Sequence, residues 1–291
     1  MNLCLGRSAI VTGAGQGIGR AHALEFARQG AAVVVNDVSA DAAAAVVEEI
    51  ASSGGQAVAN TDDVSSFDDA GALIESALRA FGRLDTLVNN AGIVRDRMIV
   101  SMSEAEWDAV IAVHLKGTFA TTRHAVDHWR SLAKAGETPE ARIVNTSSGA
   151  GLAGSIGQAN YAAAKAGIAA FTIVAAAELA RYGITVNAIA PSARTQMTVD
   201  AFPEMMAKPA SGFDAMDPSN IAPLVVWLGS AESGFVTGRV FELAGGMLSV
   251  ADGWQRGPSI DNGERWDPAA LTPVVEKLLE AAPTPQPVYG A

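Results

Sequence analysis

Short runs rich in β-branched residues alternate with longer helical patterns along most of the chain. The strand-like runs are residues 8–13, 31–37, 56–61, 84–90, 141–147, 184–190 and 239–245. Several are apolar without strict alternation, as expected of strands covered on both faces. The helical patterns occupy residues 18–29, 40–53, 67–81, 104–132, 159–182 and 219–231. This order predicts an α/β fold with a doubly wound, seven-stranded parallel sheet and helices on both faces.

Local signals support the helix boundaries. Ser39 and Ser103 stand where two helices are expected to start, and Gly30 and Gly183 stand where two are expected to end. The longest apolar run, residues 166–177, is too short to span a bilayer and predicts a helix buried on most sides.

Composition excludes several classes of partner. The chain has a net charge of −11, from 31 acidic and 20 basic residues, which argues against binding to nucleic acid or an anionic membrane. An anionic ligand remains compatible with a local basic cluster. Cys4 is the only cysteine, so no intrachain disulfide can form. We therefore expect a reducing, cytoplasmic compartment, since no cleavable signal opens the chain.

Residues 1–248 are expected to form one domain, and two stretches depart from its pattern. Residues 192–218 lack a strand and contain Pro203, Pro209, Gly212 and Pro218, which indicates a mobile lobe over a site. Residues 249–291 form a C-terminal extension, expected to pack on the core or on a neighbouring subunit. A short helix is predicted there at 268–282, with Asp267 as N-cap and Pro268 at its first position.

A glycine-rich stretch, "VTGAGQGIGR", joins the first strand to the first helix. Glycines let the backbone approach a pyrophosphate, and the helix N-terminus offers free N–H groups. A tight turn is the simpler interpretation of such glycines, but the strand-loop-helix context is that of a Rossmann-type nucleotide site. The residues placed at the cofactor by this loop are Gly13, Gly15, Gln16, Gly17, Ile18 and Gly19.

Acidic residues after the next two strands extend this site. Asp37 closes "AAVVVND", where a carboxylate can accept hydrogen bonds from the adenosine ribose and would repel a 2′-phosphate. NAD is therefore predicted rather than NADP. Asp63, next to Val64, is predicted either to bind the adenine amino group or to cap a helix. Asp37, Asp63 and Val64 are all included in the predicted cofactor site.

Tyr161 precedes Lys165 by four residues, so their side chains share one helix face. Alone, this spacing fits a lysine lying beside a core tyrosine. Together with the glycine loop, "NNAG" at 89–92 and Ser148, it resembles the short-chain dehydrogenase/reductase family. The resemblance covers residues 5 to about 247.

The resemblance implies a division of labour among these residues. Ser148 would bind the substrate oxygen, Tyr161 would exchange the proton, and Lys165 would hold the nicotinamide ribose and favour the phenolate. The resemblance also places Asn90, Ala91 and Gly92 at the cofactor, and Pro191 against its nicotinamide carboxamide. Free tyrosine has a pKa of about 10, so it needs such help to act as a base near neutrality.

Two positions depart from the family pattern. His114 replaces an asparagine that supports a proton-relay water, and it is included in the catalytic set either as a spacer or through its imidazole. We favour the spacer, since the relay contact comes largely from a main-chain carbonyl at a helix kink. "PSARTQM" (191–197) replaces the usual Pro-Gly, which leaves the roles of Thr195 and Thr198 open.

Further segments narrow the resemblance to one branch of the family. "VVVND", "VRDRMIVSMSEAEWDAVIAVHLKGTF" and "SIGQANYAAAKAGI" resemble the (3R)-hydroxyacyl-CoA dehydrogenase domain of peroxisomal multifunctional enzyme type 2, also called 17β-hydroxysteroid dehydrogenase type 4. Members of that group also have a histidine at the position of His114. The resemblance implies an acyl-CoA thioester or a steroid derivative as substrate and a homodimer or homotetramer. Small residues on helices 104–132 and 159–182 would permit close pairing between subunits.

Other interpretations stay open. They are a 3-oxoacyl carrier-protein reductase, which usually takes NADPH, a hydroxysteroid or polyol dehydrogenase, and a non-catalytic NAD-binding protein. No metal site is predicted. His124 and His128 are four residues apart but have no evident third ligand.

Overall fold

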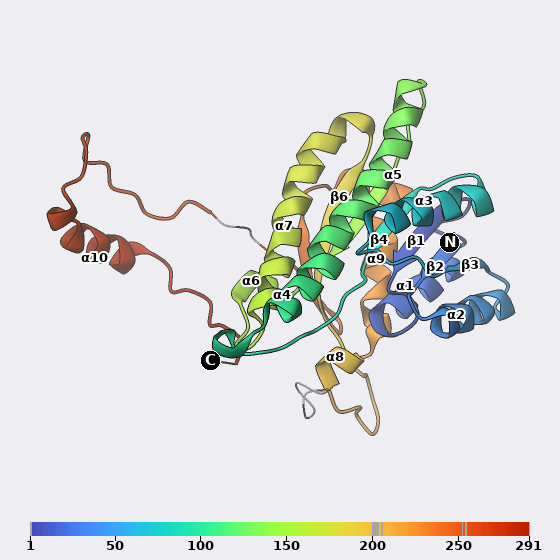
Figure 1. The fold of residues 1–291 in the computed structure, drawn as a ribbon, viewed down its shortest axis with the longest axis horizontal. Coiled ribbons are helices and arrows are strands. Elements are labelled where there is room, and N and C mark those ends of the chain that lie inside the picture. The colour runs from blue at the N-terminus through green and yellow to red at the C-terminus, as the bar shows by residue number, and fades with distance from the viewer. Residues whose placement is uncertain (1, 200–203, 205, 252, 254, 291) are drawn as a thin grey trace.

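A single twisted sheet organises the computed structural model, which describes residues 2–199, 204, 206–251, 253 and 255–290 (Figure 1). The strand order is β3-β2-β1-β4-β5-β6-β7-β8. The strands are β1 (Ser8–Thr12), β2 (Ala32–Asn36), β3 (Gln56–Asn60), β4 (Thr86–Asn89), β5 (Arg142–Thr146), β6 (Thr185–Ser192), β7 (Val240–Ala244) and β8 (Met247–Ala251). Strands β1 to β7 are parallel, which confirms the predicted doubly wound sheet.

Strand β8 was not predicted. It runs antiparallel to β7, with Ala244 paired to Met247 across the two residues Gly245 and Gly246. Gly245 has a φ of +56°, which a tight two-residue hairpin turn requires. The seven-stranded sheet therefore gains an edge strand just where the C-terminal extension was expected to begin.

Two helical layers cover the sheet. The helices are α1 (Gly17–Arg28), α2 (Ala40–Ser52), α3 (Phe67–Phe81), α4 (Glu104–Ile111), α5 (Gly117–Lys134), α6 (Gly149–Ala153), α7 (Ala159–Leu179), α8 (Gln196–Val199), α9 (Ala222–Leu228) and α10 (Leu271–Ala281). Helices α1, α2 and α9 share one apolar core with the sheet, and α3, α5 and α7 share another. Because side chains alternate along a strand, Val33 and Val35 enter the first core and Val34 enters the second.

The predicted helix boundaries hold where capping residues define them. The hydroxyls of Ser39 and Ser103 accept hydrogen bonds from the amides of Ala42 and Glu106. The helical stretch predicted over 104–132 is confirmed, but it is not a uniform α-helix. A π-helical turn at Ala112–Lys116 separates α4 from α5, and His114 lies in it. Such turns are frequent at functional sites.

Helix α7, extended by a 3₁₀ turn to Tyr182, is long and apolar enough to cross a membrane by length and composition alone. One side of it packs on the sheet, where Ile168 and Leu179 are buried. The prediction that this helix is buried on most sides is wrong for the single chain. Its outer face is exposed, and Ile173 and Val174 on it are 49% and 56% exposed.

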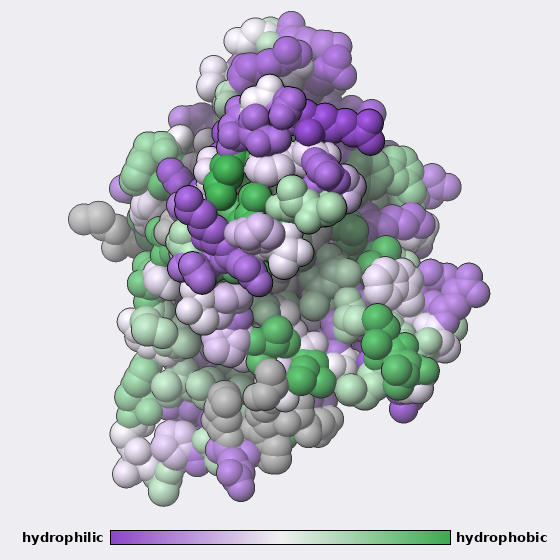
Figure 2. Space-filling model, turned by 90° about the vertical axis from the view of Figure 1, so that its left-hand side faces the viewer, coloured by the Kyte–Doolittle hydropathy of each residue, from purple (hydrophilic) through white to green (hydrophobic). Residues whose placement is uncertain are grey.

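The C-terminal extension leaves the body of the molecule and then returns to it (Figure 1). Asp267 caps the 3₁₀ turn Pro268–Ala270, and α10 follows, which confirms the predicted helix. None of the residues of α10 is buried, and its Val275 and Leu279 are exposed. Figure 2, which faces the side of α10, shows hydrophobic residues exposed among hydrophilic ones. Pro203, which the sequence also singled out, lies outside the described residues.

Candidate active site

The glycine loop is packed too closely for side chains. A Cβ on Gly19 would lie 2.1 Å from the carbonyl oxygen of Gly13, and one on Gly13 would lie 2.7 Å from the Cα of Ala91. Helix α1 begins at Gly17, and its N-cap residue Gln16 makes no side-chain cap. The first-turn amides, Ile18 among them, are therefore available to an anion, as a pyrophosphate requires.

Asp37 lies directly over this loop. Its two carboxylate oxygens accept hydrogen bonds from the amides of Gly15, at 2.9 Å, and Ser39, at 3.0 Å. A Cβ on Gly15 would lie 2.8 Å from Oδ2 of Asp37. The carboxylate is thus fixed at the end of β2, next to the glycine loop, where a ribose hydroxyl can reach it. This geometry fits a dinucleotide.

Asp63 and Val64 follow β3 in a different environment. One carboxylate oxygen of Asp63 accepts a hydrogen bond from the Ser65 amide at 2.9 Å, so the residue stabilises the turn before α3. Ser66, and not Asp63, is the N-cap of that helix. The second oxygen of Asp63 can still meet an adenine amino group. Val64 is buried against Gly117 at the start of α5.

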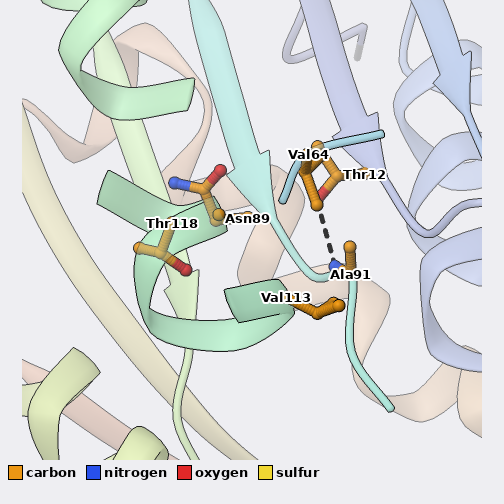
Figure 3. Close-up of a pocket in the computed structure, with 7 residues that line it drawn as sticks. Thr12, Val64, Asn89, Ala91, Val113 and Thr118 are labelled. Carbon is orange, nitrogen blue, oxygen red and sulfur yellow. Dashed lines mark hydrogen bonds between the residues drawn. The ribbon is translucent and has the colours of Figure 1, made fainter. Parts of the chain in front are cut away.

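The "NNAG" turn after β4 is pinned to β1 by Thr12. The Thr12 hydroxyl accepts hydrogen bonds from the amides of Asn90 and Ala91, each at 3.0 Å. The Asn90 side chain donates in turn to the carbonyls of Thr12 and Gly13. Figure 3 shows the Thr12–Ala91 bond and, beside it, Val113 of the π-helical turn. The cofactor loop and the catalytic helices therefore meet at this turn.

Ser148, Tyr161 and Lys165 come together where α6 packs on α7. Ser148 is the N-cap of α6, and a Cβ on Gly151 would lie 2.7 Å from the amide of Ala166, so the two helices touch closely. Lys165 Nζ lies 5.5 Å from the centre of the Tyr161 ring and donates to the Thr146 carbonyl at 2.6 Å. The triad predicted from spacing is thus brought into one place.

Burial sets the electrostatics of the triad. It raises the pKa of Tyr161, and a hydrogen bond with Ser148 acts in the opposite direction. Burial also lowers the pKa of Lys165 to about 7. The help expected from Lys165 is not among the effects that shift the pKa of Tyr161 in the protein alone. When bound, an oxidised nicotinamide would add a positive charge, which also favours the phenolate.

His114 is buried between Gly92 and Tyr161. Its ring meets the Tyr161 ring edge-on at 5.2 Å, and Nε2 lies 2.7 Å from the carbonyl oxygen and 3.0 Å from the amide of Ile93. A Cβ on Gly92 would lie 2.3 Å from the imidazole, so glycine is required there. Burial, and then the charge of Lys165, lowers the pKa of His114 to about 3. The imidazole is therefore neutral at physiological pH.

The lobe at 192–218 faces the glycine loop. A Cβ on Gly17 would lie 3.5 Å from the Thr195 methyl group, and the Thr198 hydroxyl accepts from the Thr195 amide at 2.8 Å. These contacts place Thr195 against the glycine loop and make Thr198 its support. Pro191 lies at the end of β6, paired with Leu243 of β7.

Sequence reasoning missed two residues that hold the site together. Thr12 pins the "NNAG" turn, and its only signal was the family's Thr-Gly pair. Asn160 is buried beside Tyr161, and its side chain donates to the carbonyls of Arg95 and Glu106. It thereby ties the start of α7 to α4 and to the loop after β4. Away from the site, His124 bonds the Phe67 carbonyl, and no cluster of three metal-ligating side chains occurs in the described part of the chain.

Comparison with known proteins agrees with this geometry. Residues 7–205 match the family model for short chain dehydrogenase. Hydroxyacyl-CoA dehydrogenase ChsB1 of Mycobacterium tuberculosis is 49% identical over 276 residues, which cover 92% of this chain and 86% of that protein. A crystal structure of a short chain dehydrogenase from Mycobacterium avium has a TM-score of 0.92 and 60% identity, covering 99% of this chain and all of that one.

Two relatives of lower sequence identity are named for different functions. Peroxisomal multifunctional enzyme type 2 of Mus musculus is 42% identical over 260 residues, and the chain spans 33% of its length. A 3-oxoacyl-[acyl-carrier-protein] reductase of Synechocystis is 42% identical over 246 residues, which cover 82% of this chain and 96% of that protein. This chain belongs to the short-chain dehydrogenase family. It is an oxidoreductase that acts on CH–OH groups.

Proposed function

We propose that the protein interconverts a (3R)-hydroxyacyl-CoA and the 3-oxoacyl-CoA with NAD as the hydride carrier. The observation that carries the chemistry is that Ser148, Tyr161 and the buried Lys165 lie in one cluster where α6 packs on α7. The substrate class is supported by similarity to proteins named hydroxyacyl-CoA dehydrogenase and peroxisomal multifunctional enzyme type 2. A steroid-derived acyl chain falls within this proposal.

In the proposed oxidation, the chain's own residues position the alcohol and take its proton. The Ser148 hydroxyl hydrogen-bonds the substrate oxygen, and the Tyr161 phenolate accepts the hydroxyl proton. Lys165, held by the Thr146 carbonyl, offers its remaining donors to the ribose and stabilises the phenolate. When bound, NAD would accept the hydride that leaves the substrate carbon. In the reverse direction, the proton and the hydride are transferred to a ketone.

The choice of NAD over NADP is supported by Asp37. Its carboxylate occupies the end of β2 with both oxygens already engaged by backbone amides, so it cannot turn away from the ribose. A 2′-phosphate brought there would meet a fixed negative charge. The proposed set at the cofactor is the one predicted from sequence.

The experiment that tests the function is a substrate panel with the purified protein. It comprises (3R)- and (3S)-3-hydroxyacyl-CoA, a 3-oxoacyl carrier protein, steroid alcohols and polyols, each with NAD and NADP. Highest efficiency with a (3R)-3-hydroxyacyl-CoA and NAD supports the proposal. Preference for the carrier-protein substrate with NADPH would favour the reductase, and inactivity on the whole panel would favour a non-catalytic NAD-binding protein.

The proposal also includes assembly into a homo-oligomer and a cytoplasmic location. The exposed apolar face of α7, with Ile173 and Val174, supports pairing with a second copy. Light scattering checks this, and a monomer at micromolar concentration would contradict it. The buried Cys4, whose pKa burial raises to about 11, is compatible with a reducing compartment because the thiol stays protonated.

A further inference from the structure

The last described residues of the chain return to the catalytic side of the molecule (Figure 1). We call residues 288–290 the C-terminal clasp. The Tyr289 amide donates to the Gly154 carbonyl at 3.2 Å, and the Ile156 amide donates to the Tyr289 carbonyl at 3.0 Å. These bonds make a parallel bridge between Tyr289 and Ser155. The clasp therefore runs alongside the segment between α6 and α7, which joins Ser148 to Tyr161.

The Tyr289 side chain reaches the residue next to Ser148. A Cβ on Gly149 would lie 2.9 Å from the Tyr289 hydroxyl oxygen and 3.2 Å from the nearest ring carbon. The phenol thus covers Gly149, the first residue of α6. Tyr289 is 46% exposed, and no hydrogen bond to its hydroxyl is formed by the described residues. That hydroxyl is free to bond a ligand that enters beside Ser148.

The surroundings of the clasp are apolar. Ile156 and Val288 are exposed on adjoining segments, and Val288 lies over Gly154. The Arg97 amide donates to the Gly157 carbonyl at 2.7 Å, which brings the loop after β4 alongside, with exposed Met98 at its end. One phenol hydroxyl within an apolar rim suits a ligand with a single carbonyl followed by a hydrocarbon chain.

We propose that Tyr289 binds the substrate by donating a hydrogen bond to the thioester carbonyl of the acyl group, while Ser148 holds the oxygen on the third carbon. This inference rests on the proposed function. The clasp then selects for acyl thioesters, and the rim made by Met98, Ile156 and Val288 receives the acyl chain.

The test compares Tyr289→Phe with wild type on a short- and a medium-chain (3R)-3-hydroxyacyl-CoA. KM should rise about fivefold, the effect of losing one neutral hydrogen bond, while kcat and the Kd for NAD stay within about twofold. Tyr182→Phe is the matched control, because it removes a phenol hydroxyl at the far end of α7. Its KM should not change.

A second variant ends the chain after Pro283 and so removes the clasp. It should retain its thermal midpoint, since the deleted residues are not part of either apolar core. KM should rise more for the medium-chain than for the short-chain substrate. Unchanged KM in both variants would overturn the inference while leaving the proposed function intact. A wild type that turns over no acyl-CoA would overturn both.

Discussion

The two sides of the active site are built in different ways. On the cofactor side, the glycine loop and the "NNAG" turn are fixed by hydrogen bonds of 2.9–3.0 Å from their backbone amides to the side chains of Asp37 and Thr12. On the substrate side, the lobe at 192–218 is held by a two-pronged ion pair of Arg194 with Asp214, and the C-terminal clasp by two backbone bonds. The cofactor side lies at the ends of the sheet strands, whereas the lobe and the clasp of the substrate side lie outside the sheet.

This difference separates what the fold determines from what the appended segments determine. Residues that bind the dinucleotide sit at the carboxyl ends of parallel strands, where the topology itself brings them together. Ser148 also follows a parallel strand, but the lobe at 192–218 and the clasp, which are proposed to meet the rest of the substrate, are brought to the site only by tertiary contacts. Binding of a nicotinamide dinucleotide and the reaction type are therefore common to the family, while substrate choice can vary with the lobe and the extension.

The largest effect is expected where the two sides meet. Tyr161→Phe keeps the ring against His114 but removes the proton acceptor, so kcat should fall about a thousandfold. The Kd for NAD, measured by calorimetry, should change by less than about threefold, because Asp37 and the glycine loop are untouched. Turnover near that of wild type would show that another group takes the proton.

A smaller effect concerns the stability of the cofactor side in acid. His22 on α1 is fully buried, neither ring nitrogen has a partner among the described residues, and burial lowers its pKa to about 3. The unfolded chain binds this proton near the ordinary pKa of about 6.5. The folded state therefore keeps its full stability above pH 6.5 and loses it as the pH falls toward 3.

His22→Leu should remove this dependence. Between pH 6.5 and pH 5, the free energy of unfolding of wild type should fall by about 2 kcal/mol more than that of the variant, because each pH unit is worth about 1.4 kcal/mol. Urea titrations at several pH values measure it. At pH 7.5 the variant should be at least as stable as wild type, because two buried unpaired nitrogens are gone. An equal pH slope in both proteins would show that His22 is protonated in the fold.

Asp37 offers a sharper probe of the cofactor side. Asp37→Ala should remove the ribose contacts, and Asp37→Arg should also attract a 2′-phosphate. The ratio of kcat/KM with NAD to kcat/KM with NADP should fall at least about tenfold, or ~1.4 kcal/mol. The matched control is Asp63→Ala, on the next strand end, which should leave the ratio unchanged. A wild type that already prefers NADP would show that the prediction from Asp37 is wrong.

The same contrast explains what the sequence could predict. Seven strands and most helices follow from local periodicity, and the glycine loop and Tyr161 lie in contiguous motifs. The "GG" pair at 245–246 was a signal for the β7–β8 hairpin and was missed. No local pattern announced the π-helical turn at 112–116, which depends on packing around His114. The contact between Tyr289 and Gly149 joins residues far apart in the chain, so local reasoning could not reach it.

The smallest effect is expected at His114, which touches both sides. If the imidazole carried protons during turnover, its pKa would have to lie near the working pH. Burial instead lowers that pKa to about 3, so the ring stays neutral from pH 6 to 10. The ring then acts as a spacer between Gly92 and Tyr161, at the turn whose main-chain carbonyls the family uses for the relay.

His114→Asn, a polar side chain of smaller volume, should keep kcat within about threefold with saturating NAD and leave the acid limb of the pH profile unmoved. His114→Ala serves as the comparison, because it leaves a cavity beside Tyr161 and should lose more activity without moving the limb. If the acid limb is displaced in both variants while circular dichroism is unchanged, the imidazole belongs to the proton path. The cofactor side and the substrate side would then not be separable at His114.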